Sequence, residues 1–387
     1  FLIGPYMPFF FNVTDSASIS TWSEIGIIIL MFGLGLEFNL HKLVSVGGTA
    51  IITALTAVGG MLLFGYLVGQ ALGWGTMDSV FLGGMLSMSS TTIIIKAFDD
   101  LGVQKERFAQ LVFGTLVIED IAGIFMMIIL STISVGQGIS GMALALKLGM
   151  LVLYLALWLI LGIYLLPTLL NKASPLMSDE TLLVVSLGLC FGMVLLADAL
   201  GFSSALGAFL AGSLLAGTVH AERVEHLTQG VKDLFGAVFF ISVGMMLDPA
   251  MVVKYIVPIL VLTLVTIVGK LFFSSMGVLL SGQSLKNAVH CGCSLAQIGE
   301  FAFIIASLGL SLGVIADYIY PIIIAVSVIT TLTTPFFIKH SDNIYAFVVK
   351  LLHEKLTQKL ERYTDEEQSE KEQDSDWSAF LSRYIRT

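Results

Sequence analysis

The chain has 387 residues, of which 56% are hydrophobic and only 12% are charged, and its mean hydropathy is +0.93. Soluble domains carry about 25% charged residues, so the composition excludes an ordinary soluble domain and predicts an all-α polytopic membrane protein whose main partner is the lipid bilayer. The net charge of −9 says little about the membrane part, because many acidic residues lie near the C-terminal end. No nucleic-acid partner, cofactor or soluble-enzyme motif is indicated. The three cysteines lack metal-ligand spacing and are interpreted as small core residues: Cys190, Cys291 and Cys293.

Eleven apolar segments follow one another along the chain, several of them short or interrupted by Gly and Ser. A helix needs about 20 apolar residues to cross a bilayer. The predicted segments are 22–37, 46–69, 78–98, 108–131, 143–167, 181–200, 203–217, 233–247, 252–280, 286–309 and 317–338.

The two ends of the chain differ from this apolar body. The first residues, from Phe1, have no initiator Met or signal-peptide layout and resemble the exit of a helix, so we expect an N-terminal truncation. We expect residues 1–338 to form a transmembrane domain and 339–387 a cytoplasmic polar tail or linker, with an acidic run at 365–374. The final stretch, 377–387, has an apolar stripe at helical spacing, typical of an interfacial helix or of the start of a further segment.

The basic residues predict the orientation. If the loop after the first segment is cytoplasmic, eight basic residues of the segment ends and loops lie inside and two lie outside, which satisfies the positive-inside rule. The inside group is Lys42, Lys96, Lys105, Arg107, Lys172, Arg223, Lys232 and Lys286, and the outside group is Lys147 and Lys254.

The chain also contains an internal repeat. Segments 22–37, 46–69, 78–98 and 108–131 correspond in spacing to 233–247, 252–280, 286–309 and 317–338. The third member of each set carries a small, polar run in mid-segment, and the two sets enter the membrane from opposite sides. Ordinary helix-packing motifs explain either run alone but not the matched spacing. The pattern is typical of inverted-repeat transporters with two interrupted helices at the midplane.

The most informative residues are Glu119 and Asp120, side by side in the apolar stretch 111–130. A carboxylate at bilayer depth costs at least about 2.5–3.5 kcal/mol, so intramembrane carboxylates usually mark ion or proton pathways. The alternative is a structural pair held by a buried cation or by helix termini. The pattern favours binding of a cation or a proton.

Two further charged residues lie at a similar depth, Lys270 in 252–280 and Glu300 in 286–309. Lys270 either extends its side chain toward the inner interface or pairs with the carboxylates. Because its distance from the segment end is long, we expect an ion pair with Glu119, and we expect Lys270 and Glu300 to compensate charge at the site.

Six short strings together resemble one family, the monovalent cation:proton antiporter-2 family, which includes Kef-type potassium/proton and related sodium/proton exchangers. The strings lie at 30–38, 89–96, 119–120, 207–212, 239–245 and 297–303. The resemblance covers residues 1 to about 338. It implies the sodium/proton antiporter fold, with a core and a dimerisation domain, a homodimer, two crossed discontinuous helices at 78–98 and 286–309, and about 11 of 13 spans present.

The resemblance also assigns roles to residues. The cation-binding aspartate of the family matches Asp120, and the basic partner of electrogenic members resembles Lys270. Glu119 departs from the Asn, Asp or Gln that family members carry before the aspartate, so neither the ion nor the stoichiometry follows. Side chains near the helix crossing are expected to offer oxygen ligands, namely Ser89, Ser90, Thr91, Thr92 and Gln297.

These observations predict a secondary-active antiporter, not an enzyme, that exchanges K⁺ or Na⁺ for protons by alternating access in the inner membrane of a prokaryote. Cation and proton would compete for the midplane carboxylates, with the transported cation as the only metal. A cation-coupled symporter and a gated potassium efflux channel of similar fold are the alternatives, as is a receptor with a degenerate transporter body.

Overall fold

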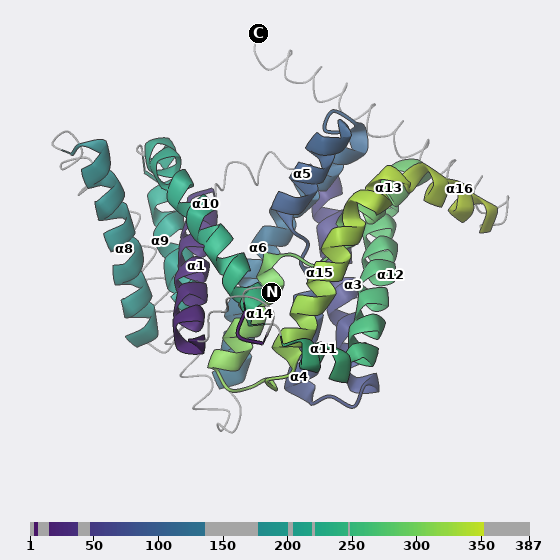
Figure 1. Ribbon diagram of the computed structural model, residues 1–387. Helices are drawn as coiled ribbons and strands as arrows, with labels where there is room; N and C mark the ends of the chain where they lie inside the picture. The colour runs from purple at the N-terminus through teal and green to yellow at the C-terminus, as the bar shows by residue number, and fades with distance from the viewer. Residues whose placement is uncertain are drawn as a thin grey trace, which may run out of the picture. The chain divides into compact units, whose positions relative to one another are not determined.

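The computed structural model describes residues 4–6, 15–37, 47–135, 177–199, 204–218, 221–246 and 248–351, and every regular element in these ranges is an α-helix (Figure 1). The helices are α1 (Ser16–Glu37), α3 (Gly48–Ala71), α4 (Thr76–Ser87), α5 (Thr91–Leu101), α6 (Arg107–Val135), α8 (Asp179–Ala199), α9 (Ser204–Ala216), α10 (Ala221–Met245), α11 (Pro249–Lys254), α12 (Ile256–Leu280), α13 (Leu285–Leu295), α14 (Glu300–Ser311), α15 (Ile319–Lys339) and α16 (Ser341–Leu351).

The helices confirm a polytopic membrane protein. Within the described residues, seven spans are long and apolar enough to cross a bilayer, and the pair α13 and α14, bent by 48°, counts as an eighth if taken as one span. The predicted segment 143–167 lies outside the described residues, as do the acidic run 365–374 and the stretch 377–387. The other predicted segments each coincide with a helix or a helix pair.

Two regions differ from the prediction. Helix α10 begins at Ala221, twelve residues before the predicted start at 233, because its first half is charged and carries no apolar signal. After α15, the chain turns at His340 and forms α16, where a polar tail was expected. Apolar residues of α16 pack on α13, which explains why this short segment is helical.

The chain divides into two compact units, each with its own packing. The first comprises 1–44, 124–256 and 304–324, and in it α1 packs against α9 and α10, and α8 packs against α9. Helices α1 and α9 pack closely at Gly35 and Gly212. A Cβ atom on Gly35 would lie 2.2 Å from the Phe209 carbonyl oxygen, so only glycine allows this contact between the two backbones.

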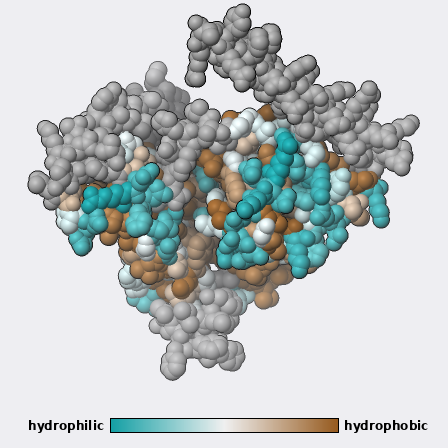
Figure 2. Space-filling view, turned by 90° about the horizontal axis from the view of Figure 1, so that it is seen from above, coloured by the Kyte–Doolittle hydropathy of each residue, from teal (hydrophilic) through white to brown (hydrophobic). Residues whose placement is uncertain are grey.

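The second unit comprises 45–123, 257–303 and 325–387. It contains α4, α5, α12, α13 and α16, together with the first part of α6. Helix α3 packs along α4, and a core of Phe98, Phe108, Val112 and other apolar residues joins α5, α6 and α13. All three cysteines of the chain are buried, as predicted, and Cys291 and Cys293 belong to this unit. In the view from above, hydrophilic residues cover much of the coloured surface, as expected where helix ends meet water (Figure 2).

Candidate ion-binding site at the helix crossing

The second unit contains both helix breaks, and they lie where the sequence predicts them. Helix α4 ends at Ser87 and α5 begins at Thr91, while α13 ends at Leu295 and α14 begins at Glu300. Each break leaves backbone groups without helical partners in the middle of a span, a position tolerated only where protein or a cavity surrounds them.

The two breaks contact each other at Gly299. Its backbone N–H donates to the Met88 carbonyl oxygen at 2.8 Å. A Cβ atom at this position would lie 2.4 Å from the Ser89 carbonyl oxygen, which is closer than any real contact. The crossing therefore requires glycine, because only a residue without Cβ lets the two backbones approach this far.

Side chains complete the crossing. Gln297 Nε2 donates to the Ser90 carbonyl oxygen at 3.1 Å, and Ser89 Oγ donates to the Leu295 carbonyl oxygen at 3.3 Å. Gln297 is fully buried, and its Oε1 has no hydrogen-bond donor among the described residues. Burying an amide oxygen without a hydrogen-bond donor costs free energy. This oxygen is therefore suited to accept a hydrogen bond or to bind a cation.

Helix α15 holds the second break in place. Ser327 Oγ donates to the Ile298 carbonyl oxygen at 3.2 Å, and Thr330 Oγ1 accepts from the Ile298 backbone N–H at 3.3 Å. The sequence alone does not reveal a role for these two residues, since a lone Ser or Thr in an apolar segment usually bonds to its own helix. Ser327 and Thr330 thus satisfy the carbonyl oxygen and the N–H of Ile298, which the break leaves without helical partners.

Glu119 lies on α6 and is buried, with 1% of its surface exposed. Its carboxylate accepts from the Ser89 backbone N–H at 3.0 Å and from Lys270 Nζ at 3.1 and 3.3 Å. The expected contact between Lys270 and Glu119 is therefore present. A charge-assisted bond of this kind is roughly twice as strong as a neutral one.

The Lys270 ammonium, on α12, has no exposed surface and three acceptors. Besides Glu119 they are the Ser87 carbonyl oxygen and Ser89 Oγ, the latter at 2.8 Å. Ser87 is the last residue of α4, so its carbonyl carries the partial negative charge of a helix C-terminus. The acceptors thus use all three ammonium protons, which is the condition for keeping a charged amine inside protein.

Asp120 has different surroundings, although it is the next residue of the same helix. It is half-buried, and Thr91 Oγ1 donates to its Oδ2 at 3.2 Å. Thr91 is the first residue of α5, where the helix N-terminus carries partial positive charge that favours a carboxylate. The hydrogen bonds of Lys270 reach Glu119 and not Asp120.

The remaining predicted residues are placed as follows. Ser90 is the N-cap of α5 and accepts from the Ile93 backbone N–H at 3.4 Å, so its hydroxyl has a structural task. Thr92 is exposed, and its hydroxyl lies 3.1 Å from that of Ser90. Glu300 is half-buried at the first position of α14, and the hydrogen bonds of Lys270 do not include it.

The donor set suits a weakly bound monovalent ion. Among the described residues, no group of three or more His, Cys, Asp or Glu side chains could hold a resident metal ion. One partly accessible carboxylate, hydroxyl groups and an amide oxygen are hard oxygen ligands of low total charge. The two adjacent carboxylates therefore differ: the Lys270 ammonium neutralises Glu119, and Asp120 is partly accessible.

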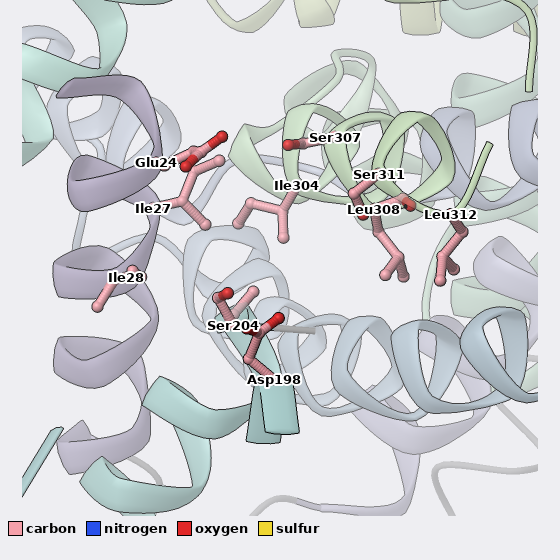
Figure 3. Close-up of a pocket in the computed structure, with 11 residues that line it drawn as sticks. Glu24, Ile27, Ile28, Asp198, Ser204, Ile304, Ser307, Leu308, Ser311 and Leu312 are labelled. Atoms are coloured by element: carbon pink, nitrogen blue, oxygen red, sulfur yellow. Dashed lines mark hydrogen bonds between the residues drawn. The ribbon is translucent and has the colours of Figure 1, made fainter. Parts of the chain in front are cut away.

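The first unit has a recess of its own, with a volume of about 360 Å³. Glu24 reaches into it from α1, Ser307 and Ser311 from α14, and Asp198 and Ser204 from the ends of α8 and α9 (Figure 3). Both carboxylates are exposed. They give this end of the first unit a local negative charge.

Membrane spans, two helices broken at one depth and charged groups gathered at the breaks define the class of secondary transporters with discontinuous helices. Comparison with known families agrees: residues 1–339 match the model of the family described as "Sodium/hydrogen exchanger, transmembrane". The chain belongs to this family, and its resemblance to the cation:proton antiporters is confirmed.

Curated relatives show the same likeness. The Escherichia coli (strain K12) protein named "Putative cation/proton antiporter YbaL" is 31% identical over 96% of this chain, which spans 66% of that protein's length. The Na(+)/H(+) antiporter of Enterococcus hirae is 30% identical over 84% of the chain and 85% of its own length. The K(+)/H(+) antiporter subunit KhtU of Bacillus subtilis is 29% identical over 90% of the chain and 87% of its own length.

A solved structure confirms the fold. The sodium proton antiporter MjNhaP1 from Methanocaldococcus jannaschii at pH 8 superposes with a TM-score of 0.60 at 15% sequence identity, covering 89% of each chain. At this identity the likeness concerns the fold alone. It agrees with the predicted antiporter fold with two discontinuous helices.

Proposed function

We propose that this protein exchanges a monovalent cation, K⁺ or Na⁺, for protons by alternating access. The observation that carries the proposal is that two neighbouring carboxylates have different surroundings. Glu119 is buried and neutralised by Lys270, while Asp120 is half-buried and bound to a hydroxyl group. Membership of the sodium/hydrogen exchanger family supports the same activity.

Asp120 is the carrier in this proposal. A carboxylate binds either a proton or a cation, and occupation by one displaces the other. The site needs a group that both ions can reach and that is not already neutralised. Asp120 is half-buried and lies outside the hydrogen bonds of Lys270, and Thr91 provides a hydroxyl oxygen beside it.

The Glu119–Lys270 pair holds the crossing in register in the proposed mechanism. Together the two side chains bond to the Ser87 carbonyl, to Ser89 Oγ and to the Ser89 backbone N–H, which are all groups of the first break. The free Oε1 of Gln297 is the further ligand that the ion would use near Ser90.

The remaining parts of the proposal concern the whole protein. We place it in the inner membrane of a prokaryote with the end of α15 in the cytoplasm, on the basis of the positive-inside rule. We also propose a homodimer, with the second unit as the moving core domain. Relatives named for Na⁺/H⁺ and for K⁺/H⁺ exchange support the class of ion but not the choice between the two.

The deciding test is Asp120→Asn in proteoliposomes. The substitution keeps the shape of the side chain and removes only the titrating group, so the fold should persist while cation-driven proton movement falls to the level of empty liposomes. Dequenching of a pH-sensitive dye after addition of K⁺, Na⁺ or Li⁺ in turn is the measurement. The matched control is Asp100→Asn, since Asp100 forms an exposed pair with Lys96 in the same unit.

Wild-type rates in Asp120→Asn would remove Asp120 as the carrier. Cation flux without any proton movement in the unmodified protein would identify a channel, and proton movement in the same direction as the cation would identify a symporter. The ion that dequenches the dye at the lowest concentration identifies the substrate.

A further inference from the structure

We propose that α16 lies in the membrane interface and docks one flank into the phospholipid leaflet at which α15 ends. The proposal concerns a surface distinct from the ion-binding site. Its starting point is the position of α16, whose first residue follows the end of α15 after a single residue, His340. Figure 1 shows α16 turning sharply away from α15. A helix that starts one residue after a membrane span must begin at the membrane surface.

The side chains of α16 form three sectors around the helix axis at 100° per residue. The first sector faces protein: Ile344, Tyr345, Val348 and Val349 pack against Leu285, Val289 and Cys293 of α13. Each of these four α16 residues is partly covered. This sector anchors α16 to the second unit.

The second sector is apolar but uncovered. Phe347 is 65% exposed and Leu351 is 77% exposed, and the two lie one turn apart on the flank next to the packed face. The apolar arc of α16 is thus wider than the surface that α13 covers. Helices of this kind with a broad apolar arc and a polar remainder lie in the plane of the membrane interface.

The third sector is polar and exposed: Asp342, Asn343, Ala346 and Lys350. Asn343 lies at its border with the uncovered apolar flank, 40° from Phe347 at helical spacing, and Lys350 lies next to it, 60° from Phe347. From that position the long Lys350 side chain reaches lipid phosphates while its stem covers apolar surface. Asp342, on the opposite border, pairs with Lys286 of α13 and is thereby kept away from the lipid side.

Continuity with the membrane-facing surface of α15 identifies lipid as the occupant. In α15, which is a membrane span, Leu332 and Phe336 are 74% and 62% exposed and also lie one turn apart. The ring of Phe336 contacts that of His340 at the turn, with 4.2 Å between ring centroids. Exposed apolar residues therefore continue from α15 through the turn into α16. An anionic phospholipid leaflet offers both the apolar region and the phosphate charge that this flank and Lys350 fit.

The test uses the full chain in nanodiscs that contain anionic phospholipid. Single cysteines at Phe347 and Leu351 carry an environment-sensitive fluorophore, and Ala346→Cys, in the middle of the polar sector, is the matched control. The three native cysteines are buried, and the labelled unmodified chain gives their background. Spin-labelled lipid should quench Phe347→Cys and Leu351→Cys several-fold more than the control, and aqueous iodide should show the reverse order.

Each other outcome overturns the proposal. Equal quenching of both sectors by iodide would mean that α16 lies in water. Protection of Phe347→Cys from both quenchers would mean that protein covers the flank, and crosslinking would then identify a second copy or the chain beyond Leu351. The two labelled positions are independent, so either one decides the result if the other variant is not monodisperse.

Discussion

At the scale of single residues, neighbouring carboxylates on α6 have different partners because successive helical side chains point about 100° apart. Glu119 faces Lys270 and the first helix break, whereas Asp120 faces Thr91 at the start of α5. This difference depends on Lys270, because its ammonium group bonds to buried acceptors that include Glu119.

The Glu119–Lys270 contact predicts strong coupling between two substitutions. Lys270→Gln leaves Glu119 as a buried carboxylate without a cation, and removing one partner of a buried pair costs about 3–5 kcal/mol. Glu119→Gln in addition should restore part of the lost stability, because it removes the orphaned charge. A double-mutant cycle on thermal stability in detergent measures the coupling. Additive effects within about 0.5 kcal/mol would show that the pair contributes no coupling energy.

A second residue-scale prediction concerns the crossing itself. In Gly299→Ala the new methyl group would meet the Ser89 carbonyl oxygen at 2.4 Å, so the two breaks must separate. Overpacking of this kind costs about 1–3 kcal/mol, and transport should fall with it. Gly59→Ala in α3 is the control, because nothing lies within 4 Å of a Cβ atom there. Comparable melting temperatures and transport rates for the two variants would contradict the tight crossing.

At the scale of elements, most helices follow from the sequence, and the exceptions have physical causes. The breaks at Met88–Ser90 and Ala296–Gly299 are visible in the sequence because small, polar residues interrupt the apolar runs there. The polar start of α10 and the short α16 are not, since tertiary contacts rather than hydrophobic length stabilise them. The Ser87 carbonyl contact with Lys270 could not be predicted either, because a backbone acceptor leaves no mark in the sequence.

The docking of α16 on α13 predicts a dependence on pH. Lys286 donates a hydrogen bond to Asp342 and holds the pKa of that carboxyl below its usual range. A lowered pKa means that the contact stabilises the folded state above the ordinary aspartate pKa of about 3.9 and loses this effect as the pH falls below it. Both side chains are exposed, so the contribution is at most about 1 kcal/mol.

The measurement is the melting temperature of Asp342→Asn against the unmodified protein across this range. The variant should be less stable at neutral pH, and the difference should vanish as the carboxyl takes up its proton. Lys286→Ala should show a smaller loss than Asp342→Asn, because His290 Nε2 also lies 3.3 Å from Asp342 Oδ1 and remains in this variant. A difference that is the same at all pH values would assign the effect to something other than the ion pair.

At the scale of the whole molecule, the two ends of the spans carry different charge, and this predicts the orientation. Lys286, at the start of α13, should be cytoplasmic, and Lys254, at the end of α11, should be external. The positive-inside rule is the reason. In intact cells, a membrane-impermeant maleimide should label Lys254→Cys but label Lys286→Cys only after permeabilisation. Labelling in the opposite order would invert the topology, and labelling of both in intact cells would show that a span was miscounted.

The closed Glu119–Lys270 pair also has an electrical consequence. Because its charges cancel, the exchange that we propose takes place at Asp120, whose carboxylate one bound cation or one bound proton neutralises equally. If the ion pair stays intact through the transport cycle, one positive charge crosses the membrane in each direction. The net charge transferred is then zero, so the membrane voltage does no work on the cycle. Only a proton that opens the pair would add an unbalanced charge, and each such charge draws on about 2.3 kcal/mol per 100 mV. In the exchange that we propose, the bond between these two side chains thus decides whether voltage or concentration alone drives transport.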